Sequence, residues 1–135
     1  MSHSSITEVD SRYLRLEIDG EWTVENARDG FEFARAEAQR LGQTRLLFDV
    51  RQLIPPRFEL VRYRTGELMA EIFGARFKLA FLGRAEGITR FAETVAVNRG
   101  ARVCVFADEK DAVAWLLEEP ARPTPPSARP TPPSA

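Results

Sequence analysis

The sequence contains few of the residues that form disulfides, metal sites and many catalytic centres. Its 135 residues include one cysteine, Cys104, and one histidine, His3. A lone cysteine excludes a disulfide within the chain and suits a reducing compartment. Cys104 lies between two valines, which favours a small core side chain over a reactive thiol. One histidine and one cysteine are too few for the common zinc sites, so we expect no metal and no other cofactor.

Long apolar runs are absent as well. No stretch approaches the roughly 18–20 apolar residues that span a bilayer. Residues 1–5 lack the basic start and apolar segment of a signal peptide. We therefore expect a cytoplasmic protein without a membrane span.

Neither sign of charge dominates the chain. Nineteen basic residues oppose 20 acidic ones, giving a net charge of −1. Such a balance provides no broad positive field, so we expect no nucleic-acid partner. Nearly all the basic residues are arginines, whose planar fork suits phosphate. Because they are scattered, we interpret the excess as genome composition, with phosphate recognition as the less favoured alternative.

The pattern of apolar residues predicts strands that alternate with helices. Strands are expected at residues 13–18, 46–50, 77–82 and 103–106, with 6–9 as a candidate for a further short strand. Helices are expected at 24–41, 58–73, around 88–99 and at 108–117. This order predicts one small α/β domain, with about four helices on a mixed, mainly parallel sheet of four or five strands.

Particular residues define these helices. Thr23 is a predicted N-cap and Gly42 a predicted left-handed C-cap of the first helix. Phe58 is expected on the inner side of the second helix, where Glu59 and Arg62 are spaced to form an ion pair on the outer side. Phe91 is expected to line the third helix towards the core.

The composition changes at Pro120. Beyond it, the sequence ARPTPPS occurs twice in succession, at 121–127 and 128–134. Such a segment buries no core and favours extended polyproline II. We expect residues 1–7 to be disordered, 8–119 to form the domain and 120–135 to be a disordered, proline-rich tail. A site for proline-recognition domains is the alternative for the tail.

The order of elements resembles that of the sulfate transporter and anti-sigma factor antagonist (STAS) domains, particularly the SpoIIAA-like branch, which is sometimes compared with lipid-binding Sec14 domains. The resemblance covers roughly residues 8–119 and is carried by Leu46-Leu47-Phe48-Asp49-Val50 and by the block from Arg102 to Leu116. It implies a small α/β domain that is usually non-enzymatic. Members of the family contact other proteins or bind a small or apolar ligand.

One motif of the family is missing. Anti-sigma antagonists carry an Asp-Ser pair where the helix after the second covered strand begins, and this serine is phosphorylated. The equivalent place lies near Arg57 and Phe58, and residues 50–64 contain no serine or threonine. Thr65, the nearest hydroxyl, is expected within the helix in a structural role. The sequence therefore does not support a phosphorylation switch.

Candidate site residues follow two of the predicted strands. Asp49 ends a covered strand, and carboxylates at such ends often face a ligand crevice. The alternative is that Asp49 caps a nearby turn. Gly83 and Arg84 follow the next strand and could border the same crevice, although their glycine spacing is not that of a nucleotide-binding loop.

The start of the second helix supplies the other candidates. Arg57 and Arg62 belong to the main local basic cluster, and Phe58 adds an aromatic ring beside them. These residues could form a docking surface or an anion pocket at the helix start. The alternative is a solvated helix face with internal ion pairs.

These observations favour a non-enzymatic regulatory or protein-interaction module, acting as a homodimer or with another protein. An enzyme needs acid, base or nucleophilic groups within reach of one another, and the sequence shows no such set. The alternative is a carrier or sensor of a small apolar or anionic, lipid-like ligand, held between the second helix and the sheet.

Overall fold

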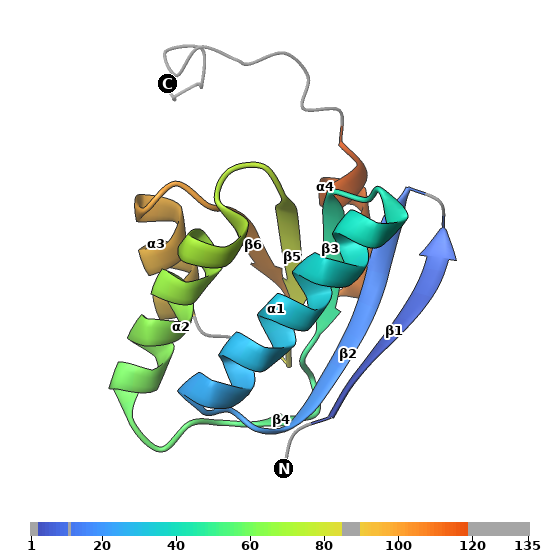
Figure 1. The fold of residues 1–135 in the computed structure, drawn as a ribbon. Helices are drawn as coiled ribbons and strands as arrows, with labels where there is room; N and C mark the ends of the chain where they lie inside the picture. The colour runs from blue at the N-terminus through green and yellow to red at the C-terminus, as the bar shows by residue number, and fades with distance from the viewer. Residues whose placement is uncertain (1–2, 11, 85–89, 119–135) are drawn as a thin grey trace.

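The computed structural model describes residues 3–10, 12–84 and 90–118 (Figure 1). The strands are β1 (His3–Asp10), β2 (Tyr13–Glu21), β3 (Arg45–Asp49), β4 (Leu53–Ile54), β5 (Lys78–Leu82) and β6 (Arg102–Phe106). The helices are α1 (Val24–Leu41), α2 (Glu59–Phe73), α3 (Arg90–Asn98) and α4 (Glu109–Leu117). The predicted proline-rich tail, at 120–135, lies outside the described residues.

The sheet is mixed and mainly parallel, as predicted. Five strands follow the order β1-β2-β3-β5-β6, and the two-residue β4 pairs with β2 beside them. β1 runs antiparallel to β2, whereas the pairings of β2 with β3, β3 with β5 and β5 with β6 are parallel. The carboxyl ends of the parallel strands therefore meet at one edge of the sheet.

β1 is longer than the sequence predicted. It begins at His3 and so includes residues 3–7, for which we expected disorder. The backbone pairs along β2, from His3 opposite Asp19 to Thr7 opposite Arg15. The mostly polar sequence of this segment gives a weak strand signal, and the pairing with β2 supplies the hydrogen bonds that the sequence pattern does not reveal.

The helices divide unequally between the two faces of the sheet. Figure 1 shows α1, α2 and α3 on one face and α4 behind the other. On the three-helix face, the rings of Phe48 and Phe81 stack with centroids 4.7 Å apart, and Phe31 meets both rings edge-on. On the other face, α4 packs Ala112 and Leu116 onto the sheet.

The caps of α1 confirm the prediction from the sequence. The side chain of Thr23 accepts a hydrogen bond from the backbone N–H of Asn26 at 3.0 Å. Gly42 has a φ of 71°, which is the left-handed conformation that ends many helices. The ends of this helix are thus determined by local sequence.

The buried side of α3 differs from the prediction. Phe91 is exposed, and its ring lies 6.3 Å from that of Tyr63, whereas Ala92 and Ala96 are buried. The reason is the close approach of α2. A Cβ atom at Gly66 would lie 2.6 Å from the carbonyl oxygen of Ala92, so this contact leaves room for small side chains only.

None of the helices in the described ranges has both the length and the apolar character needed to cross a membrane.

Candidate functional site

A cavity of about 100 Å³ lies where the parallel strands end, between the sheet and the three helices. Ile18, Phe81 and Val105 contribute to it from three strands of the sheet. The three helices contribute the apolar side chains of Ala27, Phe31, Met69 and Ala92. Crevices at the carboxyl ends of parallel strands are the usual ligand sites of α/β folds. We refer to this cavity as the apolar pocket.

Trp22 is a fixed wall of the apolar pocket. It follows β2 directly, and its indole Nε1 donates to Thr65 Oγ1 at 2.8 Å. The hydroxyl of Thr65 in turn donates to the carbonyl oxygen of Val61 at 2.7 Å. Thr65 is buried and fully engaged, in agreement with the structural role expected for it. These two hydrogen bonds hold the indole in one orientation.

Three arginines line the rim of the pocket, and they differ in how far their guanidinium groups are already bound to other side chains. Arg51 is bound to Asp49 through two hydrogen bonds of 2.7 and 2.9 Å. Arg62 lies 5.4 Å from the centroid of the Trp22 ring, and it forms the predicted ion pair with Glu59 at 3.2 Å. Arg84 is exposed and forms no ion pair with another described residue. Arg84 is therefore the most available cation at this rim.

The predicted site residues fall into three places. Arg62, Gly83 and Arg84 come together at the apolar pocket. Arg57 and Phe58 precede α2 and do not line it. Phe58 is 69% exposed rather than on the inner side of the helix, because it occupies the N-cap position with extended backbone and points away from the core.

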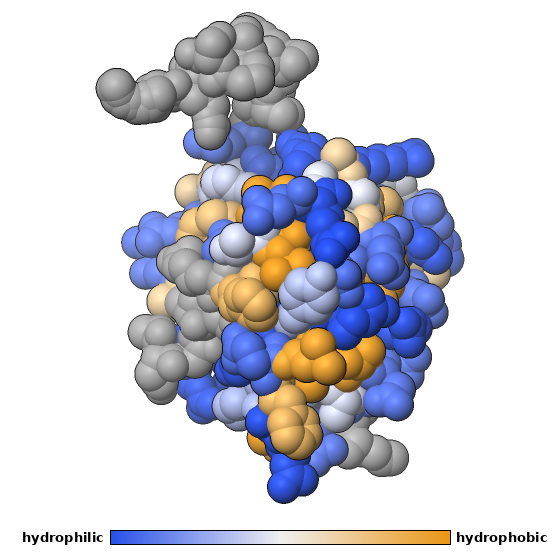
Figure 2. All heavy atoms as spheres, turned by 90° about the vertical axis from the view of Figure 1, so that its left-hand side faces the viewer, coloured by the Kyte–Doolittle hydropathy of each residue, from blue (hydrophilic) through white to orange (hydrophobic). Residues whose placement is uncertain are grey.

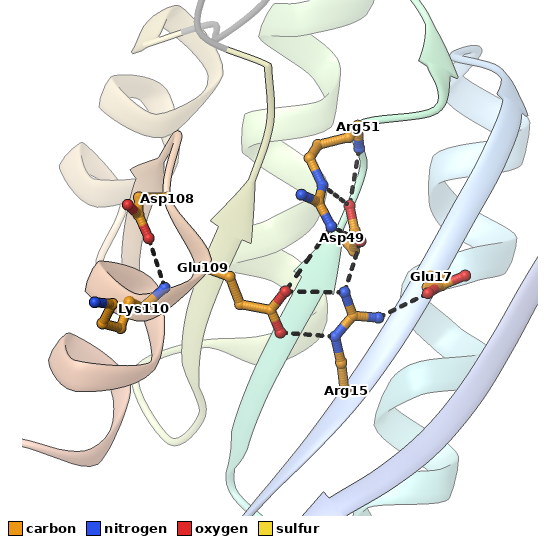
Figure 3. Close-up of polar contacts among 7 residues, drawn as sticks. All are labelled: Arg15, Glu17, Asp49, Arg51, Asp108, Glu109 and Lys110. Carbon is orange, nitrogen blue, oxygen red and sulfur yellow. Dashed lines mark hydrogen bonds and ion pairs between the residues drawn. The ribbon is translucent and has the colours of Figure 1, made fainter.

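Asp49 lies on the opposite face of the sheet from the pocket. Side chains alternate along β3, so Asp49 shares the α4 side with Leu47, while Phe48 faces the three helices. There Asp49 belongs to an ion cluster, which we define as Arg15, Glu17, Asp49, Arg51 and Glu109 (Figure 3). Asp49 Oδ1 also accepts a hydrogen bond from the backbone N–H of Arg51 at 3.1 Å. This contact corresponds to the alternative given for Asp49 from the sequence, in which its side chain caps a nearby turn.

The contacts within the ion cluster shift the pKa values of Asp49 and Arg15 towards their charged forms. Burial raises the pKa of Asp49, but hydrogen bonds from Arg51 and Arg15 outweigh it and hold this pKa below its ordinary value. Hydrogen bonds to Glu109 raise the pKa of Arg15 against the opposing effect of burial. Arg15 donates to Asp49 at 2.7 Å and to Glu109 at 3.0 Å, so it joins two strands to the first turn of α4. The cluster thus has a structural role.

Lys78 supports α4 at its other end. Its Nζ donates to the carbonyl oxygens of Trp115 at 2.6 Å and of Glu118 at 3.3 Å, and it lies 4.5 Å from the centroid of the Trp115 ring. Burial lowers the pKa of this lysine, and the nearby Arg102 acts in the same direction. Lys78 therefore caps the carboxyl end of α4. Within the described ranges, no group of three or more potential ligands could hold a metal ion.

Sequence reasoning missed Trp22 and most of the lining of the apolar pocket. The lining residues come from three helices, four strands and the loops between them, so no local pattern marks them. The available signal was the position of Trp22, which lies beyond the strand predicted at residues 13–18 and directly before the predicted N-cap Thr23.

A structural comparison identifies the fold. An uncharacterised protein of the DUF3478 family from Shewanella loihica PV-4, described as having a SpoIIAA-like fold, matches with a TM-score of 0.55 and 23% identity. The match covers 85% of this chain and 93% of that chain. This chain has a SpoIIAA-like fold. The likeness predicted from the order of strands and helices is thus confirmed at the level of the fold.

Sequence comparisons add nothing to this result. No protein-family model matches the chain, and no curated protein gives a significant match. At 23% identity the SpoIIAA-like relative informs the fold alone, so the function has to be argued from the geometry of this molecule.

Proposed function

We propose that this protein is a non-enzymatic module that binds a small ligand in the apolar pocket. The observation that carries the proposal is the cavity of about 100 Å³ between the sheet and its three helices. Protein interiors are close-packed, and an empty space forfeits the contacts that its lining atoms would otherwise make. A small domain that retains such a space at the carboxyl ends of its strands fits a binding site.

The chemistry of the lining supports binding without catalysis. Among the described lining residues, Thr65 is the one with a hydroxyl, and none is a histidine, cysteine, serine or tyrosine. Thr65 is already engaged with Trp22 and Val61. The carboxylate of Glu93 accepts the backbone N–H of Val105 at 3.3 Å. A catalytic site needs a nucleophile or a base that points towards a substrate. Thr65 and Glu93 instead form hydrogen bonds within the fold.

The proposal is tested by filling the pocket. Ala27 lies on α1 and lines the pocket, so Ala27→Phe places a ring in the space that a ligand would occupy. Ala36→Phe introduces the same side chain at an exposed position of the same helix and is the matched control. Native mass spectrometry of the purified proteins, followed by a thermal-shift screen of metabolites, reports the bound molecules.

We expect a ligand to bind the wild type and Ala36→Phe but not Ala27→Phe. Circular dichroism and a cooperative melting transition establish that the Ala27→Phe variant folds. Equal binding by a folded Ala27→Phe variant would contradict the proposal, and so would the absence of any ligand for the wild type across a broad screen.

A second candidate function is a protein-interaction module, and one observation favours it. Ile54, Phe58 and Leu60 lie within seven residues of each other and are 55%, 69% and 66% exposed. Figure 2 shows hydrophobic side chains gathered between charged ones on the side of the molecule that carries α2 and α3. Exposed apolar clusters of this kind mark interaction sites. In this case the expected partner is a second copy of the chain.

Light scattering coupled to size-exclusion chromatography tests the second function. Phe58→Ser combined with Leu60→Ser should convert a dimer into a monomer that still folds and unfolds cooperatively, because both side chains are exposed in the single chain. A wild-type monomer at all concentrations would exclude self-association through this surface. Phosphorylation does not belong to this function, because Phe58 occupies the N-cap position of α2 near which the family's serine is expected.

A further inference from the structure

We infer that the apolar pocket takes a small carboxylate with one negative charge and an apolar body no larger than about one ring, rather than a long-chain lipid. This inference rests on the proposed function of the pocket. It follows from the juxtaposition of a small, apolar cavity with Arg84 and Arg62 at the rim.

The size of the cavity limits the ligand. An engineered apolar cavity of about 150 Å³ holds benzene, whereas the pocket measures about 100 Å³. The enclosed part therefore accepts a short branched chain or a single ring that reaches partly into the mouth. A chain of ten or more carbons exceeds this space.

The walls suit an apolar body. Phe31, Phe81 and Met69 are buried and line the cavity together with the fixed indole of Trp22. Aromatic rings and a thioether make favourable contacts with a ring, in addition to the gain from removing apolar surface from water. The hydroxyl of Thr65 points its proton at Val61, so the wall near Trp22 offers no free donor from this residue.

The rim suits a single negative charge. Arg84 forms no ion pair with another described residue. Arg62 is paired with Glu59, but the glutamate side chain is largely exposed to solvent, so this ion pair is weak. Arg51 is occupied by Asp49. Two carboxylates, Glu21 and Glu93, also line the pocket.

The balance of these charges decides the class of anion. Two carboxylates line the same pocket as the two available arginines. This favours a monoanion over a doubly charged phosphate, because the glutamates would repel a second negative charge. The planar fork of an arginine matches a carboxylate through two parallel hydrogen bonds. The ligand class is therefore a monocarboxylate with a compact apolar body.

The test compares a panel of named compounds. Benzoate, phenylacetate and 3-methylbutanoate represent the inferred class, phenylacetamide is the uncharged counterpart of phenylacetate, and dodecanoate represents a long chain. Binding is followed by the fluorescence of Trp22 in a Trp115→Phe background, since Trp115 lies on the other face of the sheet and would add an unrelated signal. Calorimetry on the wild type checks the affinities.

We expect at least one of the three small carboxylates to bind, with phenylacetamide and dodecanoate at least tenfold weaker than the best of them. Arg84→Gln should weaken carboxylate binding about tenfold and leave any binding of phenylacetamide unchanged. Arg40→Gln, which changes an exposed arginine of α1 that pairs with Glu37, should have no effect.

Other outcomes overturn specific statements. Preferential binding of dodecanoate would exclude the size limit, and equal binding of phenylacetamide, or an unchanged affinity in Arg84→Gln, would exclude the anion site. In these cases the pocket remains a ligand site. Failure of all three carboxylates while the metabolite screen finds another ligand that Ala27→Phe blocks would reject the class but keep the proposed function. If a folded Ala27→Phe variant binds its ligand as the wild type does, the apolar pocket is not the binding site and the proposed function itself is rejected.

Discussion

The guanidinium of Arg15 on β2 donates to the carboxylate of Asp49 on β3 at 2.7 Å, on the face of the sheet covered by α4. The side chains are only 13% and 9% exposed. Because Arg15 also reaches Glu109, this contact joins the centre of the sheet to the helix that covers its second face. The carboxylate that the sequence marked as a candidate ligand for a crevice thus serves the stability of the fold.

Asp49→Asn should destabilise the protein by about 2 kcal/mol, because Arg15 keeps its charge in a largely buried place and loses a charged partner. Urea unfolding at neutral pH measures the change. Glu37→Gln breaks the exposed ion pair with Arg40 and serves as the control, for which we expect no measurable change. A similar effect of both substitutions would argue against a special role for Asp49.

The stabilisation by Asp49 should depend on pH in a defined direction. The pKa of Asp49 is lower in the folded protein than its ordinary value of 3.8, so folding favours the charged carboxylate. This contribution is complete above the ordinary pKa and is lost as the pH falls through the lower, folded pKa. The difference in unfolding free energy between wild type and Asp49→Asn should therefore narrow at about pH 3 relative to pH 6. A constant difference across this range would contradict the prediction.

Thr65→Val should lower both stability and ligand affinity. The substitution keeps the shape but leaves the indole N–H of Trp22 without its acceptor, at a cost of about 1–2 kcal/mol. Thr65→Ser retains the hydroxyl and should behave much more like the wild type. Thermal unfolding measures the first effect, and the fluorescence maximum of Trp22 in a Trp115→Phe background reports whether the indole has moved. Identical spectra for the two variants would show that Thr65 does not orient Trp22.

Gly66→Ala should destabilise the protein although alanine favours helices by about 1 kcal/mol over glycine. The new Cβ atom would lie 2.6 Å from the carbonyl oxygen of Ala92 and 2.8 Å from the Cβ of Val95, so α2 and α3 must separate. Chemical denaturation gives the sign of the change directly. Adding Val95→Ala should restore only part of the loss, because the contact with the backbone oxygen of Ala92 remains. A gain in stability on Gly66→Ala would mean that the two helices are not in close contact.

Trp115→Ala should cost less than the about 3–5 kcal/mol typical of a buried aromatic residue. The ring of Trp115 is half-buried, between Phe106 at a centroid distance of 5.8 Å and the ammonium group of Lys78. We expect a loss of about 2 kcal/mol. Leu116→Ala removes a fully buried side chain of the same helix and should cost more, about 3 kcal/mol, although the residue is smaller. If urea unfolding showed a larger loss of stability for Trp115→Ala than for Leu116→Ala, the result would contradict the deeper burial of Leu116.

The sequence predicted those features that depend on neighbouring residues. The caps of α1 at Thr23 and Gly42 and the ion pair of Glu59 with Arg62 are local, and the structure contains all three. The order of strands and helices was enough to predict the mixed sheet and the SpoIIAA-like fold. Local patterns carry this information because they reflect the period of each element.

The candidate site was harder to predict because it combines distant segments. The strand that contains Asp49 is apolar towards both faces, so the sequence did not indicate which face holds the three helices. Phe58 and Phe91 are aromatic residues at helical positions, yet one is at a helix start and the other is excluded by the contact at Gly66. Of the six candidate site residues, Arg62, Gly83 and Arg84 reach the pocket, and the sequence did not predict its wall at Trp22.

The two ends of α4 are attached to the sheet by different contacts, so a pulling force should break these contacts in a defined order. Glu109 holds the first turn through Arg15, and Lys78 holds the last turn through the carbonyl oxygens of Trp115 and Glu118. A force that pulls on the chain beyond Glu118 acts first on the bonds of a single ammonium group, and the arginine contact at the other end is loaded last. Under tension α4 should detach from the sheet starting at its carboxyl end, while the three helices on the opposite face stay in place around the pocket until the sheet itself unfolds.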